Sequence, residues 1–324
     1  MVSPEDYPRL LQTAVSIAEK AAPLIVDAFH SRSRQSDSLA AAADIKVATK
    51  GGNPVDLVTA TDMAVEQLIF SELRSNFPDH AFVGEETMAQ STDSSCGLSD
   101  RPTWIVDPID GTTNFVHGLP FVAICIGLTV NKTAVLGVVF NPILGDLYTG
   151  IAGQGSFWNG KQLPLFDPPR PLESLAEALV ISEYGSDRSA SVLSSKVETI
   201  HRIMAAPSRG FRSFGSAAIN MCFVARGSCD LYWEAGIHIW DICAASVIVR
   251  EAGGAVLNWT RQDAQPSAPS RLAGCSPQVL QEQFDPLARS VLVVRCMGDS
   301  NQGLDALVES VRGRLGPLPE MSRD

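Results

Sequence analysis

The sequence predicts a mixed α/β protein built from helices and sheets, and three observations indicate this fold class. Stretches with apolar residues at steps of three and four recur in both halves of the chain, as in amphipathic helices. Between them lie apolar runs bounded by Gly, Asn and Pro, as in buried strands. The chain has 324 residues, of which 45% are hydrophobic, and this suffices for one large core or two smaller ones.

The N-terminal half is predicted to start with helices and to continue with strands. Its apolar residues first recur at helical spacing and then form short runs separated by turn residues. A threonine at position 59 or 61 would cap the second helix. In chain order we expect a helix at 7–29, a loop at 30–53, a helix over 55–78, strands at 80–87 and 103–107, and a hairpin of strands 122–130 and 134–140.

A proline-rich connection, DPPRPLESLAEA (167–178), is the best candidate for a boundary within the chain. We expect an N-terminal half at 1–168, a C-terminal α/β half at 169–315 and a flexible tail at 316–324, together forming one catalytic unit. The expected elements of the second half are a strand at 178–185, a helix at 191–205, a helix leading into a strand over 215–236, and a helix at 241–254 that ends at a glycine cap.

Charge and composition exclude several classes of partner. The formal net charge of −11 would repel nucleic acid and anionic membranes, so we expect neither as a partner. The first twenty residues do not read as a secretory signal, and no run of about 18 apolar residues suggests a membrane span. Seven scattered cysteines without a CxxC pair argue against a disulfide framework or a zinc site, so a cytoplasmic location is expected.

Four acidic clusters stand at the ends of predicted elements. Neighbouring carboxylates raise each other's pKa, so they need a cation or a proton to coexist. Sites made of oxygen ligands suit hard divalent ions, and Mg²⁺ takes a few carboxylates together with water and phosphate oxygens. The clusters are Asp56 with Asp62, Glu85 with Glu86, Asp107 with Asp110, and Glu234 with Asp241.

The stretch WIVDPIDGTTNFVHG (104–118) combines two of these acids with a turn that suits an anion. A strand would deliver Asp107 to its end, the Ile109 carbonyl would face outward, and Asp110 would return to the same side. Gly111 lets the backbone approach an oxyanion closely, and its amide and that of Thr112 open a short helix. Metal, phosphate and attacking water are therefore expected to meet within a few residues.

Six motifs together resemble the inositol monophosphatase family, within the lithium-sensitive, magnesium-dependent phosphatases. They are PVDLVTATD (54–62), GEET (84–87), WIVDPIDGTTNFVHGLP (104–120), GDLYTGIAGQGSFWNG (145–160), GSAAINMC (215–222) and EAGIHIWDICAASVIVREAGG (234–254). The resemblance covers about residues 5–300. It implies the layered αβαβα sandwich of the inositol monophosphatase and fructose-bisphosphatase type, with the active site between two halves.

The resemblance also implies ligands for two to three Mg²⁺ ions. Glu85, Asp107 and the Ile109 carbonyl would hold the first ion, and Asp107, Asp110 and Asp241 the second. Glu85 with waters would complete a weaker third site. Two ions of this kind can clamp the attacking and the leaving oxygen of an in-line displacement.

Catalytic and substrate roles carry over in the same way. Thr112, hydrogen-bonded to Asp62, would orient and help deprotonate the nucleophilic water beside Glu85. The amides of Gly111 and Thr112 would hold the phosphate. The substrate hydroxyls would be contacted by Asp110, Ala217, Glu234 and Asp241. Residues given supporting or packing roles are Glu86, His117 and His238.

The chain departs from the family pattern at a few places. The loop 30–53 is longer than usual, and Lys50 is the closest match to the family's loop lysine. Asp187 stands where family members often carry a small hydroxyl near the substrate, so the family's inositol contact is not carried over to it. The segment 260–283 reads as an insertion. These changes bear on substrate choice more than on the metal centre.

The leading hypothesis is a phosphatase that hydrolyses inositol monophosphates, small-molecule phosphate monoesters, as a homodimer. One alternative keeps the chemistry and changes the substrate to a nucleotide bisphosphate, fructose bisphosphate or another sugar phosphate. Relatives that act on nucleotide bisphosphates tend to carry a lysine where this chain has Thr113, which favours the inositol branch. A second alternative is a catalytically silent paralogue that binds a metabolite or a partner protein.

Overall fold

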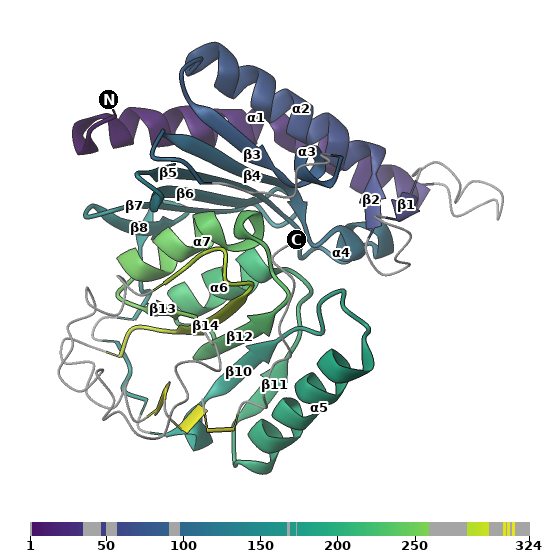
Figure 1. The fold of residues 1–324 in the computed structure, drawn as a ribbon, viewed down its shortest axis with the longest axis vertical. Coiled ribbons are helices and arrows are strands. Elements are labelled where there is room, and N and C mark those ends of the chain that lie inside the picture. The colour runs from purple at the N-terminus through teal and green to yellow at the C-terminus, as the bar shows by residue number, and fades with distance from the viewer. Residues whose placement is uncertain are drawn as a thin grey trace.

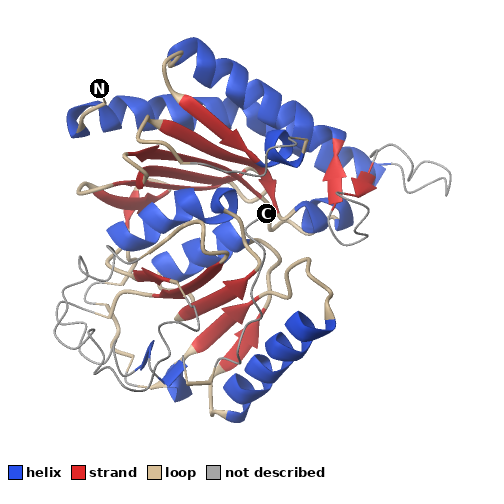
Figure 2. Cartoon of the chain, in the orientation of Figure 1, coloured by secondary structure: helices blue, strands red, loops and turns tan. Residues whose placement is uncertain are grey.

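The protein folds as five alternating layers of helix and sheet. The computed structural model describes residues 2–34, 47–49, 57–90, 98–166, 169–172, 174–258, 284–297, 307–308, 310–311 and 313–314. Along the long axis of Figure 1, two helices are followed by a sheet, two further helices, a second sheet and a last helix, and Figure 2 shows the same layers by element type. The predicted αβαβα sandwich is therefore confirmed.

The first sheet has seven strands in the order β3-β4-β5-β6-β7-β8-β9. Only β3 and β4 run parallel; the remaining neighbours are antiparallel. The predicted hairpin is present, and Asn131 and Lys132 take positive φ angles of 50° and 64° in its two-residue turn. The strands are β3 (Ala81–Gly84), β4 (Thr103–Asp110), β5 (Ala123–Val130), β6 (Thr133–Asn141), β7 (Asp146–Ile151), β8 (Gly155–Trp158) and β9 (Lys161–Gln162).

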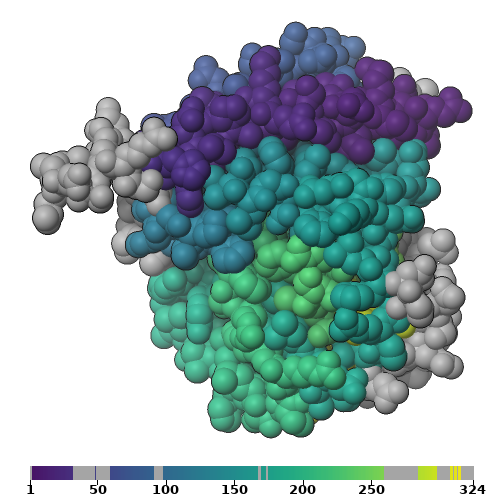
Figure 3. Space-filling model, turned by 180° about the vertical axis from the view of Figure 1, so that it is seen from behind, coloured from purple at the N-terminus to yellow at the C-terminus, as the bar shows by residue number. Residues whose placement is uncertain are grey.

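Two N-terminal helices cover the outer face of this sheet. The apolar stripes of α1 (Tyr7–Arg34) and α2 (Ala60–Asn76) share one core with β4, β5 and β6. Thr59 caps α2, since its hydroxyl accepts from the Thr61 and Asp62 amides. In the view from behind, the purple residues of α1 lie above the teal middle part of the chain, and the green later part lies below it (Figure 3). The remaining elements of this half are η1 (Pro4–Asp6), β1 (Val47–Thr49), β2 (Leu57–Thr59), α3 (Glu85–Ala89) and α4 (Thr112–His117).

A row of glycines lets α7 (Ile239–Glu251) lie close to the inner face of the first sheet. Gly127, Gly137 and Gly150 are register partners across β5, β6 and β7. A Cβ added at Gly137 would sit 2.1 Å from the Ala244 carbonyl oxygen, so any side chain there would push the helix away. Because α7 carries Asp241, this close packing fixes the height of that carboxylate above the sheet.

The second sheet has five strands in the order β11-β10-β12-β14-β13. Helix α6 (Ala217–Ala225) joins α7 on one face, and α5 (Ala190–Ala205) covers the other. The strand at 178–185 and the helix leading into a strand over 215–236 were predicted, whereas the short β11, β13 and β14 were not. The strands are β10 (Leu179–Ser182), β11 (Gly210–Arg212), β12 (Leu231–Ala235), β13 (Ala255–Leu257) and β14 (Ser290–Val294), and a 3-10 turn, η3 (Leu175–Glu177), precedes β10.

Several element boundaries differ from the sequence prediction. The helix predicted over 55–78 starts at Ala60, because Leu57–Thr59 pair with β1 as strand β2. Helix α1 continues to Arg34, into the predicted loop, and β4 continues past the predicted end at 107 to Asp110.

The strand predicted at 80–87 ends at Gly84, and α3 opens after it because Glu66 accepts the backbone amides of Glu86 and Thr87. The helix predicted to start at Asp241 starts at Ile239, since the His238 amide donates to the Asp241 carboxylate and closes a capping turn.

Several expectations lie wholly or partly outside the described residues. Lys50, Asp56, the segment 260–283, most of the loop 30–53 and the tail 316–324 belong to this group. The division of the chain at residue 168 stays a prediction. Among the described residues, no helix is both long enough and apolar enough to span a membrane.

Candidate metal centre and active site

A bulge in β4 brings two aspartates of the DPID stretch to the same side of the sheet. Asp107 pairs with Cys125 and Asp110 with Ala123, so three steps along β4 correspond to two along β5. In a regular strand, side chains three residues apart point to opposite faces. The extra residue reverses this alternation, so both carboxylates face the same cleft between β4 and α7.

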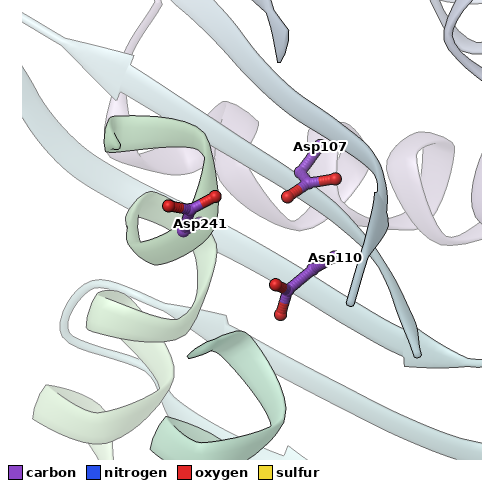
Figure 4. Close-up of side chains that lie close together, drawn as sticks. All are labelled: Asp107, Asp110 and Asp241. Atoms are coloured by element: carbon purple, nitrogen blue, oxygen red, sulfur yellow. The ribbon is translucent and has the colours of Figure 1, made fainter. Parts of the chain in front are cut away.

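Asp241 completes a group of three acids with these two. One carboxylate oxygen from each of Asp107, Asp110 and Asp241 lies within 4.8 Å of the others. Figure 4 shows Asp241 facing the two strand aspartates from the first turn of its helix. The close approach of α7 to the glycine row positions it there, and the bond of 2.6 Å from the His238 amide orients its carboxylate.

The electrostatics of the three acids show how costly this arrangement is without a cation. Burial, and next the charge of Glu85, raise the pKa of Asp107 well above its usual range. Burial, and next the charge of Asp110, do the same to the pKa of Asp241. The pKa of Asp110 rises only to about 6, because hydrogen bonds from Ser216 and Ala218 oppose the effect of burial.

Asp110 sits at the N-terminus of α6. Its carboxylate accepts from the Ser216 hydroxyl at 2.5 Å, the Ala218 amide at 2.7 Å and the Ala217 amide at 3.3 Å. Helix N-termini stabilise negative charge. Ala217, expected to meet a substrate hydroxyl, therefore directs its amide toward Asp110 in this structure.

The turn after β4 places Thr112 against Asp62. The Thr112 hydroxyl lies 3.1 Å from Asp62 Oδ1 and 3.1 Å from the Ile109 carbonyl oxygen, so it can donate to either. Asp62 is fully buried, and burial raises its pKa to about 6 despite hydrogen bonds from Thr59. A buried carboxylate that holds a hydroxyl at the mouth of a metal cluster can accept a proton through it.

Gly111 joins the strand to α4 with a φ of 90°. A Cβ there would come within 2.8 Å of the Phe121 carbonyl oxygen and 3.1 Å of the Gly215 carbonyl oxygen. Conformation and space therefore both require glycine at this position. The Ile109 amide donates to Asp107 at 3.0 Å, which helps to fix the turn before it.

Glu85 and Glu86 occupy the first turn of α3, beside the cluster. Glu85 lies near enough for its charge to raise the pKa of Asp62 as well as that of Asp107. Glu86 is buried, and its amide donates to Glu66 at 2.8 Å. Glu66, which interrupts the apolar stripe of α2, was not recognised in the sequence, although a glutamate at a buried helical position is a usable signal.

The end of β12 contributes Glu234, which is 6% exposed. The Tyr232 hydroxyl donates to its carboxylate. Burial, and next the charge of Glu183, raise the pKa of Glu234 to about 8. Glu183, which the sequence analysis also missed, accepts from the Phe214 and Gly215 amides and so holds the segment before α6.

Three further residues from the sequence analysis lie at the edge of this region. His238 caps α7 and stacks on Trp240 at 4.5 Å between ring centroids. His117 ends α4 and is exposed. Asp187 accepts from the Ser189 amide at 2.7 Å just before α5, and this bond lowers its pKa.

The donor set fits a hard divalent cation. The grouped ligand atoms are all carboxylate oxygens, and the pKa of each acid is raised by burial. A divalent ion among them would offset both the mutual repulsion and the cost of burial. The arrangement can therefore bind a cation beside a helix-opening turn suited to an oxyanion.

Solved structures from two bacteria match the fold of this chain. The extragenic suppressor protein suhB from Bartonella henselae matches with a TM-score of 0.69 and 26% identity over 95% of this chain and 98% of that one. An IMPase from Thermotoga maritima matches with a TM-score of 0.69 and 25% identity over 94% and 98%. Fold and acidic cluster thus define a phosphatase of the metal-dependent class.

Sequence comparison identifies the family. The model of the inositol monophosphatase family matches residues 6–309. Inositol monophosphatase 1 of Xenopus laevis is 42% identical over 249 residues, which cover 76% of this chain and 81% of that protein. Its Homo sapiens counterpart is 45% identical over 208 residues, covering 64% and 73%. The chain belongs to the inositol monophosphatase family, and it is a phosphatase enzyme.

Proposed function

We propose that this chain is a magnesium-dependent phosphomonoesterase that hydrolyses inositol monophosphates to inositol and phosphate. One observation carries the proposal: three aspartates, of which Asp107 and Asp110 are buried and Asp241 is half-buried, converge beside a threonine that is hydrogen-bonded to the buried carboxylate of Asp62. The relatives named inositol monophosphatase support the choice of substrate.

The ligands would come from β4, α3 and α7. Glu85, Asp107 and the Ile109 carbonyl would hold one Mg²⁺, and Asp107, Asp110 and Asp241 a second, with Glu85 and water at a third. When bound, Mg²⁺ stabilises charge on phosphate oxygens and lowers the pKa of water. Raised carboxylate pKa values mean that protons compete with the metal at these oxygens.

The remaining residues would orient the reactants. Thr112 positions the attacking water and passes its proton toward Asp62, whose pKa of about 6 leaves it mainly ionised at neutral pH. The Gly111 and Thr112 amides lie at the start of α4, where they can bind phosphate oxygens. Glu234, Asp110 and Asp241 accept from substrate hydroxyls, and Ala217 contacts the same part of the substrate.

A substrate panel tests this function. Phosphate release is measured from inositol 1-phosphate, adenosine bisphosphate, fructose bisphosphate and p-nitrophenyl phosphate, with Mg²⁺ and with a chelator. We expect inositol 1-phosphate to be preferred and chelation to abolish activity. Asp107→Asn should abolish release while the fold persists. Much faster hydrolysis of either bisphosphate would overturn the substrate assignment, and undiminished activity in chelator would overturn the metal assignment.

Three further properties belong to the same proposal. Lithium, competing at a magnesium position, inhibits at millimolar concentrations. The protein is a homodimer, and it acts in the cytoplasm. Inhibition curves, sedimentation at several protein concentrations and fractionation of cells test these points separately from the reaction itself.

A further inference from the structure

Helix α5 carries a lysine at a position where its pattern calls for an apolar residue. The helix turns Val192, Lys196, Thr199 and Ile203 inward at steps of three and four. Lys196 is only 1% exposed and is among the largest fully buried side chains described. Because lysine is rarely buried without polar partners, this position requires an explanation.

The ammonium group of Lys196 links two segments that flank the proposed substrate pocket. Its Nζ donates to the Tyr184 carbonyl at 2.6 Å, in the loop after β10, and to the Ala235 carbonyl at 2.9 Å, at the end of β12. These two bonds hold the loop against the strand that carries Glu234.

The same ammonium and the Glu234 carboxylate both flank Gly185. A Cβ added to Gly185, which has a φ of 64°, would sit 2.8 Å from Lys196 Nζ, 3.3 Å from the Ala235 carbonyl oxygen and 3.7 Å from Glu234 Oε1. The lysine, the strand end and the glutamate therefore surround one point, and only glycine in the loop leaves that point open.

The opposite charges of Lys196 and Glu234 each favour the ionised form of the other group. Burial lowers the pKa of Lys196, whereas the neighbouring charge of Glu234 raises it. The charge of Lys196 in turn lowers the pKa of Glu234, against burial and the nearby Glu183. The lysine thus shifts Glu234 toward the ionised form, which accepts two or more hydrogen bonds, against the burial that raises its pKa to about 8.

We propose that Lys196 is a positioning residue that selects substrates bearing hydroxyl groups. By fixing the loop and β12 together and by balancing the Glu234 charge, it holds that carboxylate as an acceptor for hydroxyls on the organic part of the phosphate ester. It takes no part in phosphate or metal binding. This inference rests on the proposed function and deepens it, since it names the residue behind the preference for a polyol.

Lys196→Met tests the inference because methionine keeps an unbranched apolar stem of similar length. KM for inositol 1-phosphate is expected to rise about tenfold, since a hydrogen bond to a charged group is lost or weakened. The kcat should change less than about twofold, because the reacting atoms keep their surroundings. With p-nitrophenyl phosphate, which has no hydroxyl for Glu234, both constants should stay unchanged. The matched control is Lys20→Met, at an exposed lysine on α1.

A double-mutant cycle separates positioning from general damage to the structure. In a Glu234→Gln background, Lys196→Met should raise KM less than about twofold further, because the charge that it balances is already gone. If Lys196→Met lowers the yield of folded protein, Gly185→Ala serves as a second variant, since its Cβ would displace the ammonium.

Three outcomes would each overturn the inference: Lys196→Met changes KM equally for both substrates, it changes KM for neither, or its effect adds fully to that of Glu234→Gln. Failure of the proposed function is a different result. If another hydroxyl-bearing ester in the panel is the best substrate, the comparison with p-nitrophenyl phosphate is made with that ester, and Lys196→Met should then raise its KM instead.

Discussion

The glycine row beneath α7 gives the sharpest prediction about how the fold builds the site. Substituting alanine at these positions adds one methyl group each, in strands where none of the three glycines needs a positive φ. A Cβ added at Gly137 would lie 2.1 Å from the Ala244 carbonyl oxygen. A Cβ added at Gly127 would lie 2.7 Å from Cys243 Sγ, and one added at Gly150 would lie 3.1 Å from the Ile248 Cα. We expect the loss of unfolding free energy to be largest for Gly137→Ala, smaller for Gly127→Ala and smallest for Gly150→Ala.

The size of the stability loss follows from how far α7 must move away from the sheet. Ordinary carbon–oxygen contacts are about 3.3 Å or more, so Gly137→Ala would require helix and sheet to separate by roughly 1 Å or more. Overpacking of this kind costs about 1–3 kcal/mol of unfolding free energy, and occasionally more. Gly137→Ala should cost about 3 kcal/mol, which lowers Tm by roughly 4–5 °C, because an unfolding entropy of about 2.1 cal/mol/K per residue amounts to roughly 0.7 kcal/mol/K for 324 residues. Gly150→Ala should cost about 1 kcal/mol or less.

Thermal unfolding and Mg²⁺ titration of the three variants test this reasoning. Because α7 carries Asp241, Gly137→Ala should also weaken Mg²⁺ binding. Gly150→Ala should weaken it less, since its contact at Ile248 lies four residues further along the helix than Ala244. The control is Gly145→Ala, whose added Cβ would meet nothing within 4 Å but whose φ of 69° is left-handed, so it should lose about 1 kcal/mol of stability and leave Mg²⁺ binding unchanged. Equal loss in all variants, or full Mg²⁺ affinity in Gly137→Ala, would refute the argument.

Three further predictions concern the acids and their partners. Folded-state pKa values of about 6 for Asp62 and Asp110 exceed the usual 3.8, so their contribution to stability is present below about pH 4 and is lost as pH rises through 6. In chelator, the free energy of unfolding measured with denaturant should therefore fall between pH 4 and 8, by about 3 kcal/mol for Asp62 alone. Mg²⁺ should reverse this fall, and a free energy of unfolding that rises over this range would contradict the prediction. Thr112→Ala should lower kcat about 100-fold with little change in Mg²⁺ affinity, and a kcat within a few-fold of the original would exclude its role in handling the proton. Ser216→Ala should cost about 1–2 kcal/mol of unfolding free energy, since it removes both the cap of α6 and a donor to Asp110; an unchanged midpoint would show that the bond is dispensable.

The sequence was sufficient for the layers of the fold and for the place of most acids. Long periodic stretches predict helices well, and α1, α2 and α5 lie where their apolar residues indicated. The DPID stretch was also informative, because two acids and a glycine between a strand and a short helix leave few arrangements. The structure adds the bulge that makes three-residue spacing compatible with one face.

Other features depend on contacts between distant residues and could not be predicted locally. The strands β11, β13 and β14 have three to five residues and are defined by their neighbours in the sheet rather than by their own pattern. In the sequence, Glu66 and Lys196 only interrupt an apolar stripe. Their roles depend on partners far along the chain: Glu66 binds amides twenty or more residues away, and Lys196 binds the Ala235 carbonyl. Buried polar residues in amphipathic helices are therefore the positions where a sequence prediction should search for a site.

The central claim is that carboxylates from β4 and α7 gather around divalent cations beside Thr112. Crystals grown with Mn²⁺ and phosphate test it directly, because the anomalous signal of manganese locates the ions without assumptions about chemistry. The account predicts peaks between Asp107, Asp110 and Asp241, with a phosphate oxygen adjoining them. Well-ordered crystals in which these three carboxylates surround no anomalous peak would contradict it.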